Sequence, residues 1–573
     1  MYNVSVKRRW YNSINNFKKY QENSCAHHFF QKLGKILSGF LNHSITGKLL
    51  ADHSETIKNS VVYSLYAGLI AGVVKLLDLM GNGLIRGYET SLLKKFLRLF
   101  HSDKAKKGLI VLSSICMLGI YLWVSSKFYL FELVPYLLAC FILSTVIVYF
   151  MPTSLNEAIE GSWLFRFINY VLSPDGETFT KKWNIYLLIF GIAFLPKSIT
   201  LILIAGISLL NIAINVGIRK KEWKTMIVDF GVILLLAVMV FATLISTDRS
   251  GSIRDLFIHL SAVLMIFNMI TSIDNKREFN SIVAAFVYTA SLVALYGLYQ
   301  YKVGVQLDAA WVDEANNPDL TTRVYSVFGN PNILAEYLIM AIPLAMGMVV
   351  TNKGIFKKII TLGCTAVLVL ALILTFSRGG WLGFMIGFGL MVLMFKVELI
   401  WAMIPAGVLS LFIMPESILN RLLSIGNLAD SSNAYRIKIW RITTQMISDQ
   451  WMLGVGLGYL PYKRQYLNYI RTMKVCHAHN MLLEAFAEMG IAGFIALIVL
   501  IILFIKGILR LKKQTTDKYI FYMSIAVAGS FFAVLGHGLT ENVLYLPRII
   551  WTFWMIIGFG IVLMKIGEKK QMS

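Results

Sequence analysis

The chain has 573 residues, of which 57% are hydrophobic and only 15% are charged, and this composition excludes an ordinary soluble globular domain. Its net charge of +23 comes from 54 basic and 31 acidic residues. In a membrane protein such an excess is typical of basic cytoplasmic loops in contact with anionic lipid, and binding of nucleic acid is the weaker interpretation, so no nucleic-acid partner is expected.

The N-terminal part of the chain is polar and basic. Residues 1–106 carry several lysine and arginine clusters and are expected to form a cytoplasmic or interfacial region without a cleavable signal peptide. Within this region, 61–80 is apolar but interrupted by charges, which favours an interfacial amphipathic helix over a spanning helix. Residues 107–183 are expected to hold a cytoplasmic connector and two extra spans, near 108–125 and 129–150.

Residues 184–573 are expected to form a transmembrane core of about twelve helices, so the predicted fold is an all-α polytopic bundle. The apolar runs are mostly close to the roughly 20 residues that a hydrocarbon core of about 30 Å requires. They must be helical because lipid cannot hydrogen-bond the backbone. The core runs are 184–196, 199–217, 225–246, 255–272, 280–301, 331–351, 358–376, 381–395, 398–414, 480–505, 519–540 and 548–564.

The short basic connections predict which ends of these helices face the cytoplasm. If the spans alternate, the lysine and arginine clusters near 219–221 and 506–518 fall on one side, which the positive-inside rule assigns to the cytoplasm. The long connection 415–479 is predicted to face outward although it is basic, and it could bind either lipid phosphates or another anion. The other predicted outer connections are 247–254, 302–330, 377–380 and 541–547.

The stretch FGNPN, residues 328–332, combines turn residues with a helix start. Asn330 is a suitable N-cap and Pro331 suits the first helical turn. Arg323 lies shortly before this turn, and Glu336 lies inside the following apolar run, where an unpaired carboxylate is costly. The sequence therefore predicts that Glu336 is functional and that its partner is a nearby arginine.

The stretch SRGGW, residues 377–381, joins two apolar runs through a very short turn. Arg378 must therefore stay near the membrane interface, where its planar, always-charged guanidinium could bind phosphate oxygens. Snorkelling of Arg378 to lipid headgroups is the other open interpretation. Gly383 and Gly387, four residues apart, predict close packing of the following helix against a neighbour.

The long outer connection contains two further motifs. Arg436, Trp440 and Ile447 fit helical spacing and predict an amphipathic helix on the membrane surface, which the stretch GVGLGY, residues 454–459, ends in a flexible turn. The stretch HAHN, residues 477–480, then stands directly before an apolar run.

Two histidines and an asparagine make HAHN a candidate catalytic motif. Imidazole can act as a general base near neutral pH. Asn480 can cap a helix that begins near Met481, and the N-terminus of that helix would help to keep His479 neutral. A polar interfacial residue that hydrogen-bonds a loop carbonyl is the other interpretation of His479.

The order of FGNPN, SRGGW, an arginine–tryptophan helix, GVGLGY and HAHN resembles that of the O-antigen ligase and O-antigen polymerase superfamily, over roughly residues 184–565. The resemblance implies a membrane glycosyltransferase that moves a glycan from undecaprenyl pyrophosphate to an acceptor hydroxyl. It implies action on the outer face of the bacterial cytoplasmic membrane, without a metal, a cofactor or a nucleotide sugar. It also implies His479 as the catalytic residue. The implied substrate-binding residues are Arg378, Arg436, Arg323, His477, Asn480 and Glu336.

The chemistry of the outer motifs agrees with this resemblance. Guanidinium groups can stabilise the charge that develops on a leaving pyrophosphate, and the outer connections show no acidic cluster for a divalent metal. A transporter or flippase of lipid-linked saccharides is the alternative, although the repeated halves and broken helices typical of transporters are not evident. A scaffold with merely basic loops would leave HAHN and SRGGW unexplained. The choice between ligase and polymerase, and between a glycan, a lipid and another hydroxyl acceptor, stays open.

Overall fold

The computed structural model describes residues 57–90, 115, 118–119, 180–223, 225–305, 322–426, 431–473 and 475–571. Contacts divide the chain into two units, Met1–Leu65 and Tyr66–Ser573, and the candidate site lies in the second. The predicted extra spans near 108–125 and 129–150 lie outside the described residues, apart from three isolated positions.

The part of the chain that the structure describes is helical and contains no strand, so the predicted all-α polytopic fold is confirmed. Among the described residues, 11 helices are long and apolar enough to cross a membrane. Ten of them belong to the predicted core, and the shorter apolar helices Asn184–Phe194 and Val397–Ser410 complete its twelve expected runs. The eleventh, Val61–Gly83, is the stretch that the sequence assigned to the membrane interface, and by length and hydropathy it can also cross.

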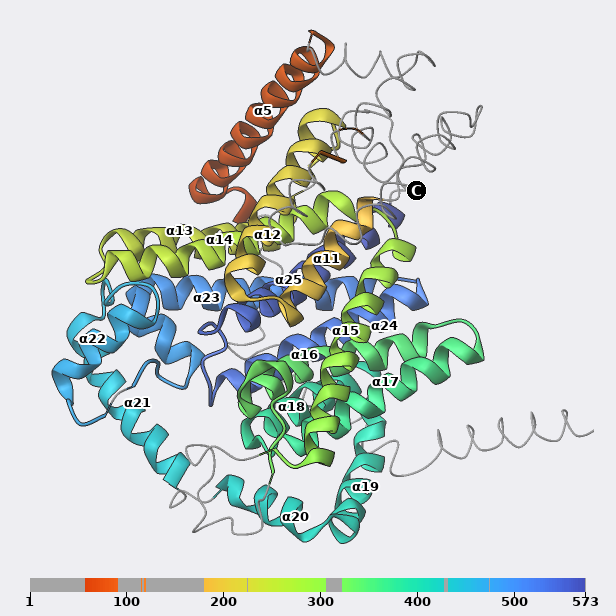
Figure 1. Ribbon diagram of the computed structural model, residues 1–573, viewed down its shortest axis with the longest axis vertical. Helices are drawn as coiled ribbons and strands as arrows, with labels where there is room; N and C mark the ends of the chain where they lie inside the picture. Colours follow the sequence, from red (N-terminus) through yellow and green to blue (C-terminus); the bar gives the residue numbers. More distant parts are fainter. Residues whose placement is uncertain are drawn as a thin grey trace, which may run out of the picture. The chain divides into compact units, whose positions relative to one another are not determined.

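Figure 1 labels the helices of the described residues in chain order. Pro196 separates the first two helices of the core because its ring removes a backbone donor and suits a helix start. The helices are α5 (Val61–Thr90), α11 (Thr180–Phe194), α12 (Lys197–Ile212) with the π-helix η2 (Ala213–Ile218), α13 (Ile227–Leu244), α14 (Arg249–Ser272), α15 (Lys276–Val303), α16 (Pro331–Thr351), α17 (Ile355–Leu374), α18 (Arg378–Phe395), α19 (Ile400–Ile413), α20 (Glu416–Leu423), α21 (Ser431–Gln450), α22 (Tyr459–Tyr469), α23 (Met481–Gln514), α24 (Lys518–Gly538) and α25 (Pro547–Gln571).

Helices α16 and α25 form the centre of the bundle. The apolar window of α25 is 100% buried and that of α16 is 78% buried, as expected of helices that are apolar on all faces. Helix α25 packs against α14 and α24, and α16 packs against α17 and α24. The large buried side chains of α25 fill the space between these helices; they include Trp551, Phe553, Trp554 and Phe559.

Two glycines of α18 allow α24 to approach its backbone. A Cβ atom on Gly383 would lie 2.6 Å from the carbonyl oxygen of Ala533, and one on Gly387 would lie 2.5 Å from that of Gly529. Real Cβ atoms do not come this close to a backbone, so both positions require glycine. The close helix packing predicted from the spacing of Gly383 and Gly387 is therefore confirmed.

The predicted outer connections contact one another, and we call this end of the bundle the predicted outer end. The pairs are Arg378 Nη1 donating to Ser424 O at 3.1 Å, Thr247 N donating to Val455 O at 3.2 Å, and His479 Nδ1 at 2.7 Å from Glu541 Oε1. Val324 N, in the 302–330 connection, donates to Leu374 O at the end of α17 at 3.1 Å. The predicted inner connections also contact one another, through ion pairs of Lys221 with Asp274 at 2.5 Å, Lys276 with Asp517 at 2.5 Å, and Lys565 with Asp274 at 3.4 Å. This grouping agrees with spans that alternate in direction.

The long outer connection is packed against the bundle. Helix α21 contacts α22 and α23, and Ile439, Thr443 and Met446 are buried beside Tyr462 and Tyr466 of α22. The predicted helix with Arg436 is therefore present, and it packs on protein rather than lying only on lipid.

The GVGLGY turn, predicted to be flexible, is held tightly. A Cβ atom on Gly456 would lie 2.1 Å from Ser246 Oγ, and Gly456 N donates to Glu488 O at 2.9 Å.

Candidate active site

The FGNPN motif starts α16 as its residues require. Asn330 Oδ1 accepts a hydrogen bond from Asn332 N at 2.8 Å, and Pro331 is the first helical residue. Arg323, which is 4% exposed, donates from Nε to Thr375 O at 2.9 Å and from Nη2 to Asn332 Oδ1 at 3.1 Å. Arg323 thus ties the FGNPN turn to the end of α17.

The SRGGW motif starts α18. Ser377 Oγ accepts a hydrogen bond from Gly380 N at 3.3 Å and caps the helix. The buried Arg378 then reaches the 3₁₀ turn after α20, where its Nη1 donates to Ser424 O at 3.1 Å. Arg378 is consequently held within protein at the predicted outer end, which disfavours snorkelling as its only role.

Four arginines from three predicted outer connections gather at this end. Burial, together with the charges of Arg421, Arg378 and Arg436, lowers the pKa of Arg323 to about 9. Arg421 was not singled out from the sequence; its Nε donates to Phe376 O at 3.2 Å and its side chain is buried. Like charges that are buried together are costly unless an anion neutralises them, so the cluster of Arg323, Arg378, Arg421 and Arg436 is suited to an anionic ligand.

The HAHN motif leads directly into α23. Asn480 Oδ1 accepts hydrogen bonds from Leu482 N at 2.9 Å and Leu483 N at 3.0 Å, so the predicted cap at Met481 is confirmed. Asn480 Nδ2 also donates to Leu539 O at 2.9 Å, which ties this loop to the end of α24. His479 has a φ of 49°, a left-handed conformation that costs a residue with a side chain about 1–2 kcal/mol. Such backbone strain is concentrated at functional sites.

Glu541, which sequence reasoning missed, organises both histidines and one arginine. Its Oε1 lies 2.7 Å from His479 Nδ1 and 3.6 Å from His477 Nδ1, while its Oε2 lies 3.5 Å from Arg436 Nη2. Burial raises the pKa of Glu541, but the neighbouring His479, His477 and Arg436 outweigh burial and hold that pKa well below its usual range. The carboxylate is therefore ionised at neutral pH.

A carboxylate beside His479 changes the interpretation of that histidine. From the sequence, only the N-terminus of α23 was expected to act on the ring and keep it neutral. A carboxylate 2.7 Å from Nδ1 suits the tautomer that carries its proton on Nδ1, in which Nε2 can accept a proton. It also stabilises the imidazolium that forms after Nε2 accepts a proton. His479 and Glu541 together have the arrangement of a general base and its orienting carboxylate.

His477 is held in a different state. Its Nδ1 accepts a hydrogen bond from His479 N at 3.3 Å, and its ring lies 4.0 Å from the His479 ring and 4.3 Å from the Tyr545 ring, centroid to centroid. Burial, then the charges of His479 and Arg436, lower the pKa of His477 to about 3, against an opposing effect of Glu541. His477 is therefore neutral at physiological pH and contacts His479, and its supporting role stays a prediction.

Glu484 holds the backbone between the two histidines. Its Oε2 accepts a hydrogen bond from Ala478 N, and its side chain is buried in the first turn of α23. Sequence reasoning missed Glu484 too, although a carboxylate inside an apolar helix is the signal that had marked Glu336. The HAHN loop is thus fixed at Ala478 by Glu484 and at Asn480 by Leu539.

Glu336 lies deeper in the bundle than the arginines. Its Oε1 lies 3.0 Å from Nε2 of the buried His537, on α24. The predicted arginine partner was therefore wrong, because α16 packs against α24 and its buried face meets His537 instead. Glu336 also interacts electrostatically with Glu541 and His479, which places the Glu336–His537 pair next to the candidate catalytic residues.

His477, His479 and Glu541 also form a candidate metal site. The ligand atoms of His477, His479 and Glu541 all lie within 4.8 Å of one another, and two imidazoles with a carboxylate suit Zn²⁺. The sequence did not indicate this group, because Glu541 belongs to a different predicted connection from the two histidines. The guanidinium of Arg436, 3.5 Å from Glu541, competes with a cation for that carboxylate.

Part of the chain matches a known protein family. Residues 363–498 match the family model described as O-antigen ligase. The matched segment runs from α17 into α23 and contains Arg378, Arg421, Arg436, His477 and His479. No curated protein matches the chain.

Proposed function

We propose that this chain, a member of the O-antigen ligase superfamily, transfers a glycan from undecaprenyl pyrophosphate to a hydroxyl of an acceptor on the outer face of the bacterial cytoplasmic membrane. The observation that carries the proposal is the position of an arginine cluster beside a histidine–carboxylate pair, since Glu541 contacts both Arg436 and His479. The arginines on one side of Glu541 suit an anionic leaving group. His479 on the other side suits a hydroxyl that must lose a proton.

The arginine cluster binds the pyrophosphate in this proposal. Arg378 and Arg436 start from different helices, and each offers a planar fork for phosphate oxygens. Arg323 and Arg421 each donate a hydrogen bond from Nε to a backbone carbonyl oxygen and add their positive charge to the cluster. Preorganised guanidinium groups stabilise the charge that develops on the leaving pyrophosphate without reorganisation of solvent.

His479 activates the acceptor. Its Nε2 takes the proton of the acceptor hydroxyl while the acceptor oxygen forms a bond to the anomeric carbon of the glycan. The bond between that carbon and the pyrophosphate oxygen breaks, and its electron pair leaves with undecaprenyl pyrophosphate. Glu541 stabilises the resulting imidazolium, and Glu484 and Asn480 hold the loop that carries His479.

The reaction is proposed to need no metal. The arginines supply the positive charge that a divalent cation would bring to a pyrophosphate, and Arg436 already contacts the carboxylate of the possible metal site. The outward direction of the site rests on the distribution of lysine and arginine along the short connections.

Purified protein in nanodiscs tests this function directly. It is incubated with an undecaprenyl-pyrophosphate-linked oligosaccharide and, in parallel, with lipid A–core, with unlinked oligosaccharide and with no added acceptor. The expected result is a new glycosidic product and release of undecaprenyl pyrophosphate. Movement of intact donor across the bilayer of a proteoliposome with no covalent product would favour the transporter alternative.

Cysteine labelling of intact cells tests the orientation. On a cysteine-free background, Arg471→Cys and Lys513→Cys provide exposed positions in the 415–479 and 506–518 connections. An impermeant thiol reagent is expected to label position 471 and not position 513. The opposite pattern would place the site in the cytoplasm and exclude an outer-face transferase.

A further inference from the structure

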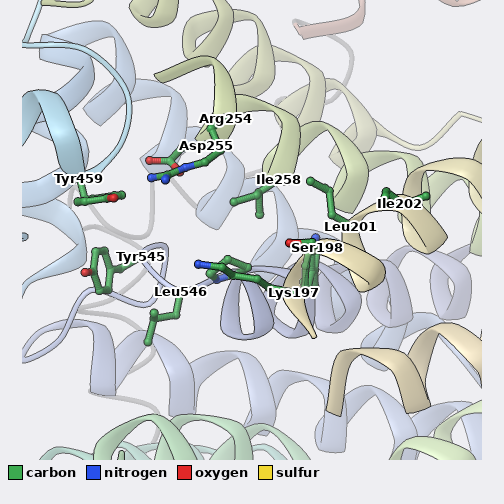
Figure 2. Close-up of a pocket in the computed structure, with 12 residues that line it drawn as sticks. Lys197, Ser198, Leu201, Ile202, Arg254, Asp255, Ile258, Tyr459, Tyr545 and Leu546 are labelled. Atoms are coloured by element: carbon green, nitrogen blue, oxygen red, sulfur yellow. The ribbon is translucent and has the colours of Figure 1, made fainter. Parts of the chain in front are cut away.

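A pocket of about 440 Å³ lies on the histidine side of the site, between α12, α14, the start of α22 and the segment that leads into α25 (Figure 2). Its volume falls in the range of roughly 300–1,000 Å³ that is usual for ligand sites. The pocket is separate from the arginine cluster, since it is lined by none of the four arginines. The reaction described above does not use it.

The wall of this pocket nearest the site is aromatic and charged. Figure 2 shows Tyr459 and Tyr545 on one side of it, with Arg254 and Asp255 beside Tyr459. The rings of Tyr459 and Tyr545 meet edge to face, 6.0 Å between centroids, and the Arg254 guanidinium lies 4.8 Å from the Tyr459 ring centroid. Arg254 Nε lies 3.4 Å from Asp255 Oδ1. Flat aromatic faces beside a fork of donors and a carboxylate suit the apolar face and the hydroxyls of a sugar ring.

Tyr545 connects this pocket to the candidate catalytic residues. Its ring lies 4.3 Å from the His477 ring, and His477 lies 4.0 Å from His479. Contacts thus run from Arg436 through Glu541 to the two histidines, and from His477 through Tyr545 to the pocket. The pocket therefore adjoins the histidines through Tyr545, whereas the arginine cluster adjoins them through Glu541.

The other wall of the pocket is apolar and reaches the flank of a membrane-spanning helix. Leu201 and Ile202 of α12 and Ile258 of α14 line it. Ile202 is 71% exposed and lies within the candidate span Lys197–Ile218, so this side of the pocket opens where lipid chains would lie. A ligand that fills both walls has a sugar at one end and an apolar chain at the other.

We propose that this pocket binds the acceptor, and that the acceptor is a membrane-anchored glycan whose terminal sugar lies against Tyr459, Tyr545, Arg254 and Asp255. The inference rests on the proposed transferase function and adds to it the place and chemical class of the second substrate. Tyr459, Arg254 and Asp255 act on acceptor binding alone, whereas the arginine cluster acts on the donor.

Steady-state kinetics in nanodiscs test the inference with three variants, Tyr459→Leu, Arg254→Gln and Asp255→Asn. Each is expected to raise the KM for the acceptor by about tenfold or more, while kcat and the KM for the donor stay within about twofold of the wild type. The matched controls are Tyr299→Leu and Arg471→Gln, at exposed positions that do not line the pocket. In the wild type, removal of the lipid from the acceptor is expected to raise its KM as well.

The acceptors used are lipid A–core and a second undecaprenyl-pyrophosphate-linked oligosaccharide, which distinguish the two sources of a membrane-anchored glycan. Unchanged acceptor KM in all three variants, or a selective increase in the donor KM, would overturn the inference while leaving the transferase intact. Absence of transfer by the wild type with every acceptor would instead contradict the proposed function.

A binding measurement makes the inference independent of turnover. Ser198 is exposed and lines the pocket, so Ser198→Cys on a cysteine-free, His479→Asn background reports occupancy without transfer. The acceptor that the wild type uses is expected to protect this cysteine from a thiol reagent, and the same glycan without its lipid is expected to protect it less. Equal labelling with and without either acceptor would contradict the assignment of the pocket.

Discussion

Glu541 Oε1 lies 2.7 Å from Nδ1 of His479, although the two residues belong to different predicted outer connections. The same carboxylate meets Arg436 through its other oxygen. Glu541 therefore couples the group that is proposed to take a proton to the groups that are proposed to bind the leaving pyrophosphate. Removal of the Glu541 charge is expected to affect proton acceptance by His479 directly.

Substitution of Glu541 by glutamine removes the charge and keeps the size of the side chain. The transfer rate is expected to fall by about 10²–10⁴-fold because the imidazolium of His479 loses its stabilising anion. The pKa of Glu541 is held well below its usual range, so in the wild type the carboxylate loses its charge only when the pH falls far into the acid region. The loss of wild-type activity that comes from protonation of Glu541 is therefore expected only far into the acid region, and it is expected to be absent in Glu541→Gln.

The control for Glu541→Gln is Glu416→Gln, at an exposed position on α20. It is expected to match the wild type in rate and in pH dependence. Transfer at the wild-type rate by Glu541→Gln would show that this carboxylate does not act in the reaction.

Arg378→Lys and Arg436→Lys test the arginine cluster. Lysine keeps the charge but loses the bidentate fork, so the KM for the lipid-pyrophosphate donor is expected to rise by about 10–10²-fold. Arg471→Lys, in an exposed part of the same outer loop, is expected to change neither kinetic constant. Wild-type kinetics in both Arg378→Lys and Arg436→Lys would reduce these arginines to lipid or structural contacts.

The possible metal site predicts a specific response to cations. Protein stripped with a chelator is expected to keep its transfer rate, because the proposed reaction uses arginines rather than a metal. Added Zn²⁺ is expected to inhibit by binding His477, His479 and Glu541, whose ligand atoms lie within 4.8 Å of one another. Loss of activity on chelation with recovery on addition of Mg²⁺, Mn²⁺ or Zn²⁺ would show that the cluster holds a catalytic metal.

The close contact between α18 and α24 predicts a difference between two neighbouring glycines. Gly387→Ala would place a Cβ atom 2.6 Å from Ala533 Cβ, so the free energy of unfolding is expected to fall by about 1–3 kcal/mol. Gly389→Ala meets nothing within 4 Å and is expected to leave that free energy unchanged or raise it by up to about 1 kcal/mol. Thermal unfolding of both variants in the same detergent measures the difference. Equal melting temperatures would contradict the packing.

Local patterns allowed most of the bundle to be predicted. A run of about 20 apolar residues specifies a spanning helix regardless of its neighbours, and the caps at Asn330, Ser377 and Asn480 depend on residues within one turn. For the same reason the starts of α16, α18 and α23 lie close to where the motifs predicted them.

Contacts between distant segments could not be predicted from these patterns. Glu541 and Arg421 lie in no recognisable sequence motif. They join the candidate site only because separate segments pack together at the predicted outer end. His537 became the partner of Glu336 because α24, rather than the arginine-bearing turn, packs against that face of α16. The pocket beside Tyr545 likewise joins four segments that are far apart in the sequence.

In the proposed reaction His479 accepts the proton of the acceptor hydroxyl while the arginines hold the donor. His479→Asn tests it most directly, because asparagine tolerates the left-handed backbone found at this position and removes only the imidazole. In nanodiscs, the single-turnover transfer rate is predicted to fall by about 10²–10⁴-fold with the affinity for the lipid-pyrophosphate donor within about twofold of the wild type, and His477→Asn is predicted to cost less. Transfer at the wild-type rate by His479→Asn, or inactivity of His477→Asn alone, would contradict this role of His479.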